Sequence, residues 1–141
     1  IIYLAVLWVS SAVANPIHGE IEFDQFRQLK IREIQEHLRL VQEDPLDAIR
    51  YFNLGLAYMA MGRHRKEIDS YLEAIRLDFS YAKAHFNLAM AYDILKNSEA
   101  AISHARKAEV LYGQKRKHRQ VRQVRRFLNV LNEKYRFLKH K

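Results

Sequence analysis

An eight-residue stretch of this chain, Tyr51–Tyr58, occurs a second time at His85–Tyr92. The copies read Tyr-Phe-Asn-Leu-Gly-Leu-Ala-Tyr and His-Phe-Asn-Leu-Ala-Met-Ala-Tyr, and they lie 34 residues apart. Outside the stretch, Ala74 and Ala108 are separated by the same interval. A fixed period of this size that extends beyond the copied stretch indicates a repeated supersecondary unit rather than chance similarity.

The repeated unit resembles the tetratricopeptide repeat in its length and in its pattern of small and bulky residues. The first copy supplies the signature residues Tyr51, Leu54, Gly55, Tyr58, Tyr71 and Ala74, and the second supplies Leu88, Tyr92, Ala101 and Ala108. Glu67 departs from the family pattern at an alanine position, and Phe79 and Gly113 stand where a final proline is usual. The resemblance implies an all-α fold, a short solenoid of two helix-turn-helix repeats at about residues 48–81 and 82–113.

Local signals divide the repeats into helices. Asp47 and Ser80 are suited to cap the first helix of each repeat, because their side-chain oxygens accept bonds from free backbone N–H groups. Gly62 can take the left-handed conformation that ends the first of these helices.

Amphipathic helices are predicted on both sides of the repeats, which occupy residues 45–113. The segment 15–44 contains a linker and then apolar residues at helical spacing, namely Ile31, Ile34, Leu38 and Val41. The segment 114–141 carries a longer stripe, namely Val121, Val124, Leu128, Leu131, Tyr135 and Leu138. Since an end repeat must cover its apolar face, we expect these helices to cap the solenoid. For the first helix, a coiled-coil contact with a partner is the alternative.

The first fourteen residues, Ile1–Ala14, contain no charged side chain. Their length suits the apolar region of a signal peptide, and Ala12-Val13-Ala14 has the small-x-small form that precedes cleavage. A retained membrane anchor is the alternative. The following residues include acids but no Lys or Arg before Arg27, and basic flanks normally stay on the cytoplasmic side. We therefore expect an extracytoplasmic (periplasmic or secreted) domain, which the N-terminal segment would hold at the membrane if it is retained.

Most classes of catalytic and metal site lack the required residues. The chain has no Cys, and its seven His include no pair three or four residues apart on one helix. It also lacks a Gly-rich phosphate loop, a nucleophile elbow and an HExxH motif. We therefore expect no enzyme activity, no metal and no cofactor.

The net charge of +8 belongs to the C-terminal segment. Residues 114–141 contain 11 Lys and Arg against one acid, whereas residues 1–113 contain 13 against 15. The basic surface predicted here consists of Lys115, Arg116, Lys117, Arg119, Arg122, Arg125 and Arg126. It could contact an acidic partner, an anionic membrane or, least expected for an exported protein, nucleic acid, or it could simply be solvated.

The resemblance also implies a partner-binding surface, because the first helices of tetratricopeptide repeats line a concave groove. By the repeat register, its residues here are Ile49, Phe52, Leu56, Met59, Lys83, Phe86, Met90, Asp93 and Ile94. The carboxylate clamp of some family members is not supported, since Phe52 and Leu56 occupy its positions, although Asn87 is in place. This mainly apolar lining favours an apolar helix or extended segment, which could be the chain's own 20–43 helix or a partner.

These features predict a non-enzymatic scaffold that is exported or membrane-anchored and helps to assemble a larger, membrane-associated complex. The alternative is a module that binds an anionic surface or nucleic acid through the basic C-terminal helix.

Overall fold

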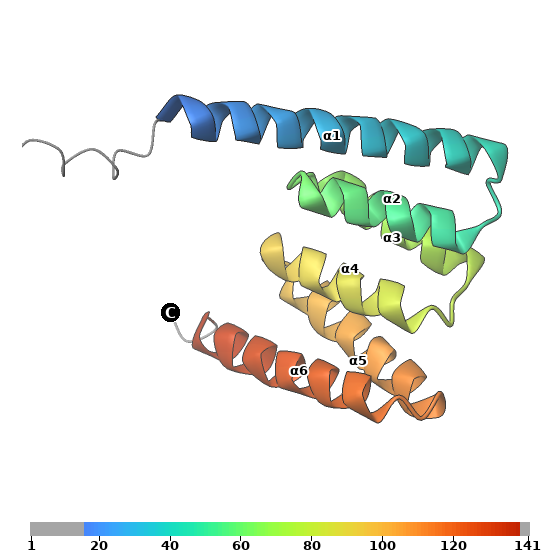
Figure 1. Cartoon of the computed structure of the whole chain (residues 1–141). Helices are drawn as coiled ribbons and strands as arrows, with labels where there is room; N and C mark the ends of the chain where they lie inside the picture. Colours follow the sequence, from blue (N-terminus) through green and yellow to red (C-terminus); the bar gives the residue numbers. More distant parts are fainter. Residues whose placement is uncertain (1–15, 139–141) are drawn as a thin grey trace, which may run out of the picture.

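A computed structural model describes residues 16–138 of the chain, and the Ile1–Ala14 segment lies outside them. Six helices follow one another along the chain: α1 (Pro16–Glu43), α2 (Ala48–Ala60), α3 (His64–Leu77), α4 (Ala82–Ile94), α5 (Ser98–Gln114) and α6 (His118–Leu138). Helices α2 and α3 form one antiparallel pair and α4 and α5 the next, with α1 and α6 at the two ends of the stack (Figure 1). The prediction of a two-repeat helical solenoid with flanking helices is confirmed.

Of the three residues predicted to begin or end helices, Asp47 and Gly62 do so and Ser80 does not. Asp47 caps α2, with its Oδ1 accepting a bond from the Ile49 N–H at 2.8 Å. Gly62 has a φ of 65° and follows the end of α2, as predicted. The prediction for Ser80 is wrong: its hydroxyl donates to Asp78 Oδ1 at 2.7 Å, and α4 begins after Tyr81 without a side-chain cap.

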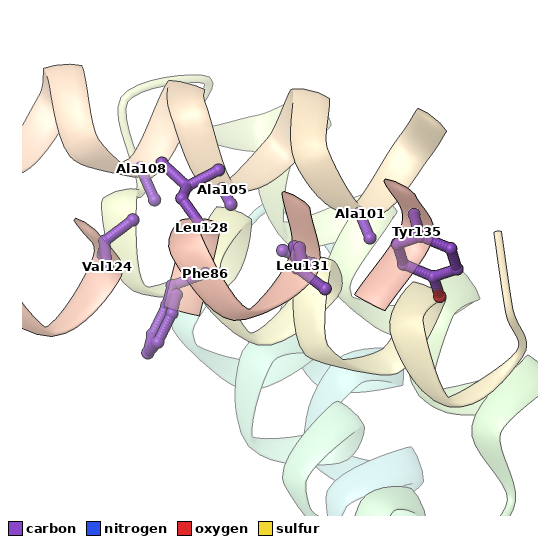
Figure 2. Close-up of a cluster of buried hydrophobic side chains, with 9 residues drawn as sticks. Phe86, Ala101, Ala105, Ala108, Val124, Leu128, Leu131 and Tyr135 are labelled. Atoms are coloured by element: carbon purple, nitrogen blue, oxygen red, sulfur yellow. The ribbon is translucent and has the colours of Figure 1, made fainter. Parts of the chain in front are cut away.

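The core consists of three clusters, each shared by neighbouring helices. Between α1 and α2 the buried residues are Ile34, Leu54, Ala57 and Tyr58. Among α2, α3 and α4 they are Phe52, Ile68, Tyr71, Ala74, Ala84, Leu88 and Ala91. Among α4, α5 and α6 they are Phe86, Ala89, Ala101, Ala105, Ala108, Val124, Leu128, Leu131 and Tyr135 (Figure 2). The end helices are therefore part of the hydrophobic core.

Close packing in the first repeat depends on Gly55. A Cβ atom at this position would lie only 2.4 Å from Cε1 of Tyr71, whose side chain is fully buried. The second repeat has Ala89 and Ala105 at the corresponding positions, so there a small residue replaces the ring. The two repeats fill the same space between their helices with different pairs of residues.

Helix α1 is much longer than α2, and its first half extends beyond it (Figure 1). Phe23 and Phe26 of this first half are about half exposed and line a hollow with Met61 at the end of α2. Arg27 and Lys30 lie over their rings. Across residues 16–138, no helix combines the length and the apolar character needed to span a bilayer.

Candidate partner-binding face

The nine residues predicted to contact a partner lie on α2 and α4, and we call them the partner face. Four of them are exposed, namely Ile49 (59%), Met59 (40%), Ile94 (53%) and Lys83. Leu56, Met90 and Asp93 are half-buried, and Phe52 and Phe86 are buried. The partner face thus has exposed apolar side chains and a lysine in the first turn of α4, while its two aromatic rings are buried.

Phe52 is fixed by aromatic neighbours. Its ring centroid lies 5.5 Å from that of Tyr71 and 5.1 Å from that of Tyr81. Lys83 also lies over this ring, with Nζ 5.0 Å from the Phe52 centroid. Because the phenol of Tyr71 is buried, its pKa rises to about 12, and the Asn87 amide donates to its oxygen at 3.3 Å. Phe52 therefore belongs to the core beneath the partner face and is not itself available to a partner.

Two of the predicted residues face α6. The ring of Phe86 meets Phe127 edge-on, with 5.6 Å between centroids. The Asp93 carboxylate accepts bonds from Lys134 Nζ at 2.7 Å and from the Tyr135 hydroxyl at 2.6 Å. The repeat register predicts the side of α4 on which Phe86 and Asp93 lie. It does not show that α6 covers both residues.

The chain's own N-terminal helix does not cover the partner face. Ile34 and Val41 of α1 pack with Leu54 and Tyr58, which lie on a different side of α2 from Ile49 and Met59. Arg50 fixes the same arrangement by donating to the Leu40 carbonyl at 2.7 Å. Of the two occupants considered from the sequence, α1 is therefore excluded by its position.

The predicted basic surface is exposed, but its members differ in their contacts. Arg125 binds Glu109 across the α5–α6 contact at 2.6 Å, and Lys115 donates to the Ser80 carbonyl at 3.0 Å. Arg116 has a φ of 52° and makes the left-handed turn between α5 and α6. The remaining members, Lys117, Arg119, Arg122 and Arg126, are exposed on the turn and on α6.

A hollow of about 810 Å³ opens elsewhere, between the start of α5 and the end of α6. Its lining consists of Ser98, Glu99, Ile102, Ser103, Arg106, Asn132, Tyr135 and Arg136, and none of the predicted site residues is among them. The partner face consists of exposed side chains along two helices, which suits a protein segment better than a small molecule.

His85 belongs to the core and pairs with His104 of α5. Their Nδ1 atoms are 3.0 Å apart, and His85 Nε2 lies 3.2 Å from the Phe79 carbonyl oxygen. Tyr92 stacks on the His104 ring. Burial lowers the pKa of both histidines, and the charge that His85 can carry further lowers that of His104. The sequence alone does not indicate that these two histidines meet.

The polar side chain of Glu67 is also buried, at the alanine position of the repeat. It lies 2.8 Å from Nδ1 of His64, one turn earlier on α3. Burial raises the pKa of the carboxyl group, and the bond to His64 acts in the opposite direction. The departure from the family pattern is therefore accommodated by a local partner.

Comparisons with known proteins agree with this geometry. Residues 48–81 match the family model described as tetratricopeptide repeat, and residues 78–133 match a domain of unknown function, DUF6340. No curated protein sequence matches the chain.

Solved structures share the fold at low sequence identity. The type III secretion translocator chaperone SycD of Yersinia enterocolitica has a TM-score of 0.72 and 21% identity, with 83% of this chain and 82% of that chain covered. PcrH in complex with the chaperone binding region of PopD has a TM-score of 0.69 and 16% identity, covering 90% and 99%. The TPR2B domain of yeast Sti1 in its pHsp70 complex has a TM-score of 0.71 and 16% identity, with 84% of this chain and 94% of that chain covered.

Proposed function

We propose that this chain, which is a tetratricopeptide repeat protein, is a non-enzymatic adaptor that holds an apolar segment of another protein on its partner face. The observation that carries the proposal is the exposure of Ile49, Met59 and Ile94 on adjoining helices, with α1 packed elsewhere. Apolar side chains arranged along one surface are suited to an amphipathic helix or extended segment. The solved complexes of PcrH and Sti1 support the proposal by analogy, because each holds a part of another protein.

The test is selection of a random 16-residue peptide library, displayed on phage, against the full chain. We expect specific binders that require the partner face. In the variant Met59→Glu/Ile94→Glu, a charge replaces each exposed apolar contact, and the affinity of the selected peptides should fall at least about tenfold, since one buried side chain is worth about 1.5–3 kcal/mol.

A matched control changes two exposed apolar residues on the other helix of each repeat, Leu72→Glu/Val110→Glu. This variant should bind the selected peptides as the unchanged chain does, and circular dichroism should show that both variants fold. Recovery of no specific binders, or equal losses in both variants, would contradict the proposal.

We also propose that the adaptor works outside the cytoplasm, in a complex at a membrane. The support comes from the uncharged Ile1–Ala14 segment and from the absence of Lys and Arg before Arg27.

Cell fractionation combined with intact mass tests this location. The mass of a chain that begins at Asn15, found in the extracytoplasmic fraction, would indicate an exported protein. A larger mass in the membrane fraction would indicate an anchored one. Recovery of the uncleaved chain in the cytoplasm would overturn the proposal.

A further inference from the structure

The partner face continues onto α6. Phe127 and Lys134 of α6 contact Phe86 and Asp93, which belong to the partner face. Val130 lies between these two contacts in the sequence, and it is 59% exposed. At 100° of rotation per residue, Val130 stands beside them on the edge of α6 that borders α4. An exposed apolar side chain therefore stands beside the two residues of α6 that contact α4.

The same edge of α6 carries arginines without carboxylate partners. Arg119 and Arg126 lie within about 40° of Val130 around the helix axis, and Arg122 lies about 80° from it on the same side. All three are exposed, and none forms an ion pair within the described residues. Arg125 and Lys134, on either side of this edge, are paired with Glu109 and Asp93. Glu133 is the acidic residue of α6, one turn beyond Val130.

Lys83 adds a cation on α4, within the partner face. Its Nζ lies over the Phe52 ring, and no ion pair to a carboxylate forms among the described residues. Like charges three or four residues apart on a helix destabilise it slightly, so the unpaired arginines oppose the stability of the free chain. Carboxylates supplied by a partner would relieve this repulsion.

We infer that the segment held on the partner face is acidic as well as apolar. Its apolar side chains would contact Met59, Ile94 and Val130, and its carboxylates would contact Lys83 and the arginines Arg119, Arg122 and Arg126. The inference rests on the proposed function and specifies the chemistry of the partner. The charges set the orientation and selectivity of the segment, and the apolar contacts supply most of the affinity.

Other anionic ligands fit this surface less well. Val124, Leu128 and Leu131 are buried in the core, so α6 has no free apolar face to insert into a membrane. Phe52 and Phe86 are buried too, so the described partner face offers no aromatic platform on which bases could stack. A protein segment uses both the exposed aliphatic residues and the cations beside them.

The same phage selection tests the inference when the selected peptides are sequenced. Peptides that bind the unchanged chain should be enriched in Asp and Glu next to their apolar residues. The variant Arg119→Glu/Arg122→Glu/Arg126→Glu should bind them at least about tenfold more weakly and should select peptides enriched in Lys and Arg instead. At 0.5 M NaCl the difference between the unchanged chain and the variant should shrink, because salt screens exposed charges.

The control is Arg32→Glu/Arg65→Glu/Arg106→Glu, which makes the same change in net charge at exposed positions on α1, α3 and α5. This variant should keep the preference for acidic peptides.

The outcomes separate the two proposals. Peptides that depend on Met59 and Ile94 but show no acidic enrichment would overturn the inference and leave the proposed function standing. Loss of all specific binders would overturn both. The inference would also be overturned if the selected peptides showed no acidic preference and the three arginines instead bound an anionic ligand. The ligands tested are vesicles with 30% phosphatidylglycerol and a 30-nucleotide single-stranded DNA.

Discussion

Replacement of Gly55 by alanine is expected to lower the free energy of unfolding by about 2 kcal/mol, although alanine is the better helix former. The added Cβ would lie 2.4 Å from Cε1 and 2.6 Å from Cδ1 of Tyr71. The ring cannot move aside easily, because it is fully buried, contacts Phe52 and accepts a bond from Asn87. Urea unfolding of the full chain measures the change.

Gly113→Ala provides the control within the same fold. Gly113 also lies in a helix, near the end of α5, but a Cβ there would meet nothing within 4 Å. The substitution should be neutral or raise stability by up to about 1 kcal/mol. If Gly55→Ala proved as stable as Gly113→Ala, the close contact between α2 and the Tyr71 ring would be disproved.

Acidification from pH 7.5 to 5 is expected to destabilise the fold through His85 and His104. Burial lowers the pKa of both in the folded state, so the unfolded chain binds more protons below the ordinary histidine pKa of about 6.5. Stability should therefore be full above that pH and fall as pH decreases, until the lowered folded-state values are reached. Each histidine contributes at most about 1.4 kcal/mol per pH unit.

The groups around the pair act in known directions. The nearby charge of Lys107 lowers the pKa of His85, whereas Asp78 and the Phe79 carbonyl raise it. Glu67 has a raised pKa, so its protonation at lower pH favours the folded state and opposes the effect of the histidines.

A variant copied from the first repeat isolates the histidine effect. His85→Tyr/His104→Ser installs the residues found at the corresponding positions, Tyr51 and Ser70. The loss of stability between pH 7 and 5, measured by urea unfolding at each pH, should be much smaller in this variant. NMR titration of the unchanged chain provides a second measurement, and ordinary pKa values for both rings would contradict the prediction.

Much of the fold follows from periodicity. The apolar stripe of the C-terminal segment predicted the residues through which α6 caps the second repeat, and Val124, Leu128, Leu131 and Tyr135 are all buried. The 34-residue period placed both helix pairs, since the signature residues encode the close contacts within each repeat.

The site was less predictable because it depends on which helix covers which face. A register assigns Phe86 and Asp93 to a side of α4, but only the position of α6 shows that Phe127 and Lys134 cover them. The signal for this contact lay in Phe127 and Val130, which widen the apolar stripe of α6 beyond the needs of one neighbour. The pairing of His85 with His104 has no sequence signal, because the first repeat has Tyr51 and Ser70 at the corresponding positions and the period therefore indicates no histidine pair.

Because α1 is longer than α2, the two ends of α1 should differ in stability. The second half of α1, with Ile34, packs on α2, whereas its first turns extend past the end of α2, and Phe23 and Phe26 line a hollow with Met61 at that end (Figure 1). Short helical segments are marginal in water, so this N-terminal arm of α1, beyond the end of α2, should open locally while residues 31–43 remain folded. A pull applied to the chain at Pro16 would therefore unwind the arm first and leave the partner face undisturbed.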